Sequence, residues 1–119
     1  MNKIAEAKTK IFTRDFYQCR FPGCFVRGEQ NLELAHRIAK GKGNRKYIRN
    51  KIRQWFGEDL DEAGIDKIIH HHFNLVTSCR IHNPYFNLAN NKQMADQLIL
   101  EIYFDLKSID YKDPGNGYD

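Results

Sequence analysis

The chain contains the run Asn74-Leu75-Val76-Thr77-Ser78-Cys79-Arg80-Ile81-His82-Asn83. The apolar residues near its start belong to a segment, 72–77, that is typical of a β-strand. Cys79 and His82 follow with two residues between them, which is a common spacing for two ligands of one metal ion. Asn83 and Pro84 then indicate a helix start, with Asn83 as the N-cap. We therefore expect a helix over 84–108, either continuous or broken around residues 90–91.

A second close pair of ligands lies far upstream. Cys19 and Cys24 enclose Pro22-Gly23, which predicts a tight turn that brings the two thiols together. Three cysteines and one histidine are a standard ligand set for structural Zn²⁺, and this set uses all 3 cysteines of the chain. The spacing therefore predicts a structural zinc site that joins the N-terminal segment to the start of the last helix. The alternative is three buried free cysteines and a surface histidine.

Hydropathy periodicity outlines the rest of a single α+β domain over residues 1–119. In chain order we expect a helix over 3–18, a strand over 31–38, a basic helix over 45–56, a helical turn or loop at 66–70 and a frayed tail at 110–119. Alternation in the first strand places His36 on an otherwise apolar face. The basic helix belongs to a basic insert over about 40–57 and ends near Gly57.

Charge is unevenly distributed along the chain. Residues 1–56 carry 14 Lys and Arg against 4 Asp and Glu, whereas residues 57–119 carry 5 against 11. A strongly basic half predicts a polyanionic partner, most often nucleic acid. No apolar run is long enough to span a bilayer, and the first residues do not resemble a signal peptide. We therefore expect a soluble, cytoplasmic protein with no membrane partner.

Four polar residues form a possible catalytic set. His36 ends a predicted strand, Asn74 begins the next one, and Asn83 and Asn87 share one face of the predicted helix. A neutral histidine can take a proton from water, and an asparagine can orient that histidine through its side-chain amide. Oxygen ligands can hold a divalent ion that offsets charge on a phosphodiester. The set therefore suits phosphodiester hydrolysis.

The residues 19–24, 34–38 and 74–83 together resemble the HNH endonucleases of the ββα-metal class, in the form that carries a zinc knuckle. Residues 13–19 are similar to the helix that leads into the knuckle in that family. The resemblance covers about residues 8–90. It implies a small α+β fold in which two strands and a helix surround a catalytic metal. It also implies a DNA endonuclease of the kind that phages and mobile elements encode.

The resemblance assigns a role to each matching position. His36 matches the general base, and Asn74 matches the central asparagine that holds the base in place. Asn83 and Asn87 match ligands of a catalytic divalent ion, which we expect to be Mg²⁺, with Mn²⁺ or Ni²⁺ as alternatives. The structural knuckle is matched by Cys19, Cys24, Cys79 and His82, the last at a place usually held by cysteine.

One position departs from the family pattern. The residue before the base is usually Asp or His and binds the catalytic metal, but here it is Ala35. Glu33, His71 or His72 could replace the missing ligand, or a phosphate could complete the shell. Otherwise the chain is a weak or inactive nuclease.

The basic insert predicts DNA contacts. Arg45, Arg49 and Arg53 repeat every four residues and form one stripe along a helix. Phosphate contacts release counterions and so supply affinity. The predicted DNA-binding residues are Arg37, Lys40, Lys42, Arg45, Lys46, Arg49 and Arg53. The alternative is a solvated helix face that Trp55 and Phe56 anchor to the core.

Two other functions fit the same sequence. A zinc-stapled nucleic-acid-binding module without catalysis would explain Ala35. A structural zinc protein could instead use its basic helix to bind an acidic protein partner.

Overall fold

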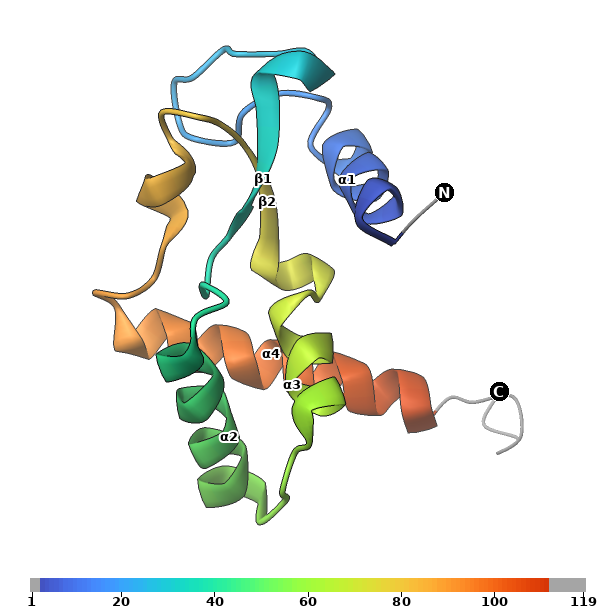
Figure 1. The fold of residues 1–119 in the computed structure, drawn as a ribbon, viewed down its shortest axis with the longest axis vertical. Helices are drawn as coiled ribbons and strands as arrows, with labels where there is room; N and C mark the ends of the chain where they lie inside the picture. Colours follow the sequence, from blue (N-terminus) through green and yellow to red (C-terminus); the bar gives the residue numbers. More distant parts are fainter. Residues whose placement is uncertain (1–2, 112–119) are drawn as a thin grey trace.

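A computed structural model describes residues 3–111 of the chain, with side chains over 5–108. Within that range it is an α+β fold with a two-stranded antiparallel sheet and four α-helices (Figure 1). The α-helices and strands are α1 (Lys3–Arg14), β1 (Leu32–His36), α2 (Lys42–Phe56), α3 (Glu62–Ile69), β2 (Leu75–Cys79) and α4 (Lys92–Tyr111). Short 3₁₀ helices are η1 (Glu29–Asn31), η2 (His72–Asn74) and η3 (Asn83–Phe86). None of the described helices is long and apolar enough to cross a membrane.

The sheet pairs the two predicted strands in one register. Ala35 lies opposite Val76, and His36 lies opposite Leu75. α1 packs against one side of the two-stranded sheet, and η3 packs against β1 (Figure 1). The alternation that places His36 on an apolar face also assigns Ala35 to the opposite, polar face, and this is wrong, because Ala35 is completely buried. Both faces of this strand are covered, so a simple two-sided pattern does not apply.

A buried carboxylate fastens α1 to β2. Asp15 accepts a hydrogen bond from the backbone N–H of Thr77 at 3.0 Å and two from the Arg14 guanidinium at 2.9 Å each. Arg14 also donates to the carbonyls of His72 and Leu75. Burial acts to raise the pKa of Asp15, but the hydrogen bonds from Arg14 and Thr77 outweigh it and lower that pKa. The carboxylate is thus held in its charged form.

Two hydrophobic cores flank the two-stranded sheet. The smaller one lies beside the N-terminal part of the chain and contains Phe12, Leu32, Cys19 and Cys79. The larger one is rich in isoleucine and lies between α2, α3 and α4, which gather at one end of the sheet (Figure 1). Trp55 and Phe56 pack against this larger core, as the alternative interpretation of the basic helix expects.

Several helix boundaries differ from the predictions. α1 ends at Arg14 rather than at residue 18, because Phe16 and Tyr17 adopt left-handed conformations with φ of 60° and 54°. Residues 66–69, expected as a helical turn or a loop, are the end of a full helix, α3, whose first turn is capped by Asp61. β2 begins three residues later than expected because residues 72–74 form η2. α2 ends at Gly57 in the left-handed conformation, as predicted.

The predicted helix 84–108 is interrupted. η3 ends at Phe86, Asn87 is extended, and α4 begins at Lys92. The break falls around residues 90–91, which is one of the two expected alternatives. The side chain of Asn91 accepts a hydrogen bond from the backbone N–H of Met94 and so caps α4. The predicted frayed tail, apart from residues 110–111, lies outside the described residues.

Candidate functional site

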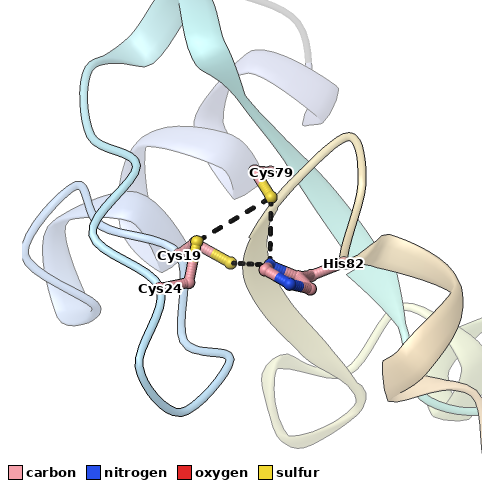
Figure 2. Close-up of side chains that lie close together, drawn as sticks. All are labelled: Cys19, Cys24, Cys79 and His82. Atoms are coloured by element: carbon pink, nitrogen blue, oxygen red, sulfur yellow. Dashed lines mark hydrogen bonds between the residues drawn. The ribbon is translucent and has the colours of Figure 1, made fainter.

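Four side chains converge from distant parts of the chain. Cys19 and Cys24 come from the loop after α1, whereas Cys79 and His82 come from the end of β2 and the turn after it (Figure 2). His82 Nδ1 lies 3.3 Å from Cys79 Sγ and 3.8 Å from Cys19 Sγ, and Cys24 Sγ lies 4.0 Å from Cys79 Sγ. Ligand atoms around a tetrahedral Zn²⁺ are about 3.5–3.8 Å apart. The cluster can therefore hold a metal ion, as the spacing predicts.

The surroundings of Cys79 favour its thiolate, whereas burial raises the pKa of the Cys19 thiol. Cys24 N–H donates to the carbonyl of Phe21, which closes the predicted Pro-Gly turn. Burial acts to raise the pKa of Cys79, but the backbone N–H groups of His82 and Ile81 outweigh it and lower that pKa. The Phe21 ring stacks on the His82 ring at 4.1 Å between centroids and shields it from solvent.

Asn74 lies at the centre of the fold, with no exposed surface. Its side-chain amide accepts from the Ile38 backbone N–H at 2.8 Å and donates to the Ile38 and Ile69 carbonyls at 3.0 and 2.8 Å. The expected contact from this amide to the His36 ring is therefore wrong. Asn74 instead fixes the backbone on which His36 stands, because its amide matches the N–H and C=O of Ile38.

His36 stands at the end of β1 and is partly buried. Its Nε2 lies 3.3 Å from Nδ1 of His70, and the two rings meet edge to face. Burial, the nearby His70 and Lys40 lower the pKa of His36 to about 4. At neutral pH the imidazole is uncharged and can accept a proton, as a general base must.

The sequence did not predict that His70 would contact His36. His70 is the residue after α3, and the sequence predicts only a helical turn or a loop for this segment. The available signal was the spacing of Ile65, Ile68 and Ile69, which matches one face of a helix, together with Asp61 as its N-cap.

The two asparagines expected as metal ligands do not share a helix face. Asn83 is in η3 and donates to the Glu33 carboxylate at 2.5 Å, whereas Asn87 follows η3 and accepts from the Ala89 backbone N–H at 2.7 Å. The expectation that they form a joint pair on one helix is wrong, because the chain is extended at Asn87. Of the proposed replacements for the ligand missing at Ala35, Glu33 is the one in contact with Asn83.

His72 is the first residue of η2 and His71 is its N-cap; with Asp105 of α4 they form a second group of closely spaced ligand atoms. His71 Nδ1 accepts from the Phe73 backbone N–H at 3.0 Å. The proton of the neutral ring therefore sits on Nε2, which donates to Asp105 at 2.7 Å. These hydrogen bonds use both nitrogens of His71 to fasten η2 to α4.

The arginine stripe on α2 is paired with acidic residues. Arg45 contacts Glu62 and Asp66, Arg49 contacts Glu62 as well, and Arg53 contacts Asp59. The acidic segment after α2 folds back along that helix, which the separate charge counts of the two halves did not reveal. Lys40, Lys42 and Lys46 have no acidic partner among the residues that the structure describes.

Arg37 lines an open groove of about 640 Å³ that borders β2. Arg14 and Arg20 also line this groove, together with Leu75, the strand partner of His36. Over the described residues, Arg37 has no carboxylate within ion-pair distance. The groove therefore carries one unpaired guanidinium next to His36 in the chain.

No family model matches the chain, and neither the curated proteins nor the solved structures include a significant match.

Proposed function

We propose that this protein is a metal-dependent DNA endonuclease that hydrolyses phosphodiester bonds with His36 as the general base. The observation that carries the proposal is the uncharged, partly exposed His36 imidazole; the next residue in the chain, Arg37, lines the open groove. A base that is unprotonated at neutral pH and an unpaired guanidinium meet two requirements of phosphodiester hydrolysis. The resemblance to HNH endonucleases agrees with this assignment.

Each residue has a defined part in the proposed reaction. His36 takes a proton from the attacking water, and Asn74 fixes the backbone that carries His36. Arg37 contacts the phosphate in the groove. Glu33 and Asn83 offer a carboxylate and an amide oxygen, which suit Mg²⁺ or Mn²⁺. Such an ion, when bound, supplies positive charge to the developing oxyanion.

We also propose that Zn²⁺ occupies the cluster of Cys19, Cys24, Cys79 and His82 as a structural ion. The donor set and the separations of its ligand atoms support this choice. Its part is to join the loop after α1 to the end of β2, since the smaller core around Phe12 holds few residues.

The second candidate is a zinc-stapled module that binds nucleic acid without cleaving it. The burial of Ala35 favours it, because a methyl group inside the fold leaves no metal ligand at this position. In that case Lys40, Lys42, Lys46 and Arg37 would still contact phosphates.

Plasmid cleavage separates the two candidates. Zinc-loaded wild type, His36→Ala and His72→Ala would be compared in Mg²⁺ and in Mn²⁺, after circular dichroism confirms that each variant folds. The nuclease proposal predicts cleavage by wild type and His72→Ala and at least about 100-fold slower cleavage by His36→Ala. DNA binding without cleavage by any of the three would instead support the binding module.

A further inference from the structure

His36 and His70 direct ring nitrogens at each other. The separation of His36 Nε2 from His70 Nδ1 is 3.3 Å, and the ring planes are 80° apart. Across the described part of the chain, each ring has the other as its one hydrogen-bond partner. Since both imidazoles are neutral nitrogen donors when unprotonated, the pair has the composition of a chelate.

Hydrogen bonds to the backbone position both histidines before any ligand binds. Asn74 binds Ile38, two residues after His36, and also Ile69, directly before His70. The backbone N–H of His70 in turn donates to the Asp66 carbonyl at 2.9 Å, and this hydrogen bond closes the last turn of α3. One fully buried side chain thus fixes both segments that carry the imidazoles, so little ordering remains for a ligand to impose.

We propose that His36 Nε2 and His70 Nδ1 together bind one divalent ion of the late first transition row, such as Ni²⁺ or Zn²⁺. With metal–nitrogen distances of about 2.05 Å, nitrogens this far apart subtend an angle of roughly 105° at the ion, close to tetrahedral. His70 is exposed and His36 is partly exposed, so water or phosphate oxygens can complete the shell. Imidazole nitrogen selects such ions, whereas Mg²⁺ prefers oxygen.

The neighbouring His71 is a weaker ligand for the same ion. Hydrogen bonds to Phe73 and Asp105 engage both nitrogens of His71, so an ion at its Nε2 would displace the proton donated to Asp105. The ring nitrogens of His36 and His70 donate to no carboxylate in the described structure. The pair is therefore the more accessible nitrogen site.

One consequence rests on the proposed nuclease function. An ion on Nε2 of His36 leaves the remaining proton on Nδ1, and neither nitrogen can then accept a proton from water. An ion that fills the pair should therefore inhibit cleavage that depends on Mg²⁺. Glu33 and Asn83 would keep the Mg²⁺, since their donors are oxygens.

Calorimetric titration with Ni²⁺ tests the site. The protein would carry no histidine tag and would be loaded with one equivalent of Zn²⁺ per chain and then freed of excess Zn²⁺, so that the cysteine cluster is filled and the histidine pair is left open to Ni²⁺. We expect one Ni²⁺ per chain for wild type and for His72→Ala, and at least about tenfold weaker binding by His36→Ala, His70→Ala and His70→Gln. Wild-type affinity in both His70 variants would overturn the proposal. Loss of Ni²⁺ binding in His72→Ala alone would assign the ion to the His71 group and would also overturn it.

A cleavage assay keeps this test separate from the proposed function. If wild type cleaves DNA in Mg²⁺, added Ni²⁺ should inhibit wild type at concentrations at least tenfold below those that inhibit His70→Gln. Equal inhibition would contradict the blocking role. If wild type does not cleave DNA at all, the nuclease proposal fails, and the calorimetric result still decides whether the histidine pair binds metal.

Discussion

The side chain of Asn74 forms a two-way hydrogen-bonded pair with the backbone of Ile38: its oxygen accepts from the Ile38 N–H at 2.8 Å, and its nitrogen donates to the Ile38 carbonyl at 3.0 Å. The pair imitates one step of a β-ladder just beyond the last residues of β1. The same nitrogen donates to Ile69 at the end of α3. Asn74 therefore connects the two-stranded sheet to the larger, isoleucine-rich core.

Replacing this asparagine should destabilise the whole domain. In Asn74→Ala the buried N–H of Ile38 and the carbonyls of Ile38 and Ile69 lose their partner, which should cost about 2–4 kcal/mol. Urea unfolding would measure the loss. Asn50→Ala, at an exposed position of α2, is the matched control and should change stability by less than about 0.5 kcal/mol. A loss as small as that of the control would show that water replaces the Asn74 amide.

Removal of metal should unfold the knuckle. A strong chelator should lower the melting temperature of wild type and expose the smaller core around Phe12, because folding and metal binding are coupled in such sites. Cys79→Ser should have the same effect without chelator. Readdition of Zn²⁺ should restore the wild-type melting curve. Identical curves with and without chelator would contradict a structural ion.

The sequence predicted local features better than long-range ones. Each ligand pair, Cys19 with Cys24 and Cys79 with His82, depends on a short segment; that the two distant pairs meet followed from the ligand set of Zn²⁺, and the structure brings the four side chains together. The contact of His36 with His70 depends on how α3 folds against α2 and α4. No local pattern encodes that packing, because α3 is defined by burial against other helices.

The asparagine ligands show the same limit. A continuous helix after Asn83 would place Asn87 on the same face, but η3 ends at Phe86 and the chain extends. The Asn90-Asn91 pair signals a break, yet it does not specify where the side chains on either side of it point. The partner of Asn83, Glu33, comes from β1 and follows from the strand register.

The charge of Asp15 should matter for stability in a defined pH range. Its pKa in the folded state is lowered from the ordinary value of 3.8. A carboxylate with a depressed pKa stabilises the fold above about pH 4, and this stabilisation is lost as the pH falls through the folded-state pKa. Asp15→Asn should therefore be less stable than wild type by about 1.5–3 kcal/mol at pH 7, because charged hydrogen bonds are lost.

The difference between these two proteins should stay constant down to about pH 4 and shrink below it. Urea unfolding at a series of pH values would measure it, with Asp59→Asn as the control at an exposed carboxylate. A difference that already shrinks between pH 7 and pH 5 would show that another titrating group, rather than Asp15, controls the acid response.

Two triple variants with equal charge should affect DNA binding differently. Lys40, Lys42 and Lys46 have no acidic partner among the described residues, whereas Arg45, Arg49 and Arg53 are ion-paired. Glutamine at the three lysines should reduce the salt dependence of binding by up to about 2–3 units of slope, since each free cation releases counterions from DNA. Glutamine at the three arginines should reduce the slope by less than about 1 unit, because their charge is already partly neutralised.

Binding to a labelled duplex over a range of salt concentrations would give both slopes. Equal reductions would mean that Glu62 and Asp59 release their arginines when DNA binds, and the acidic segment would then compete with DNA for α2.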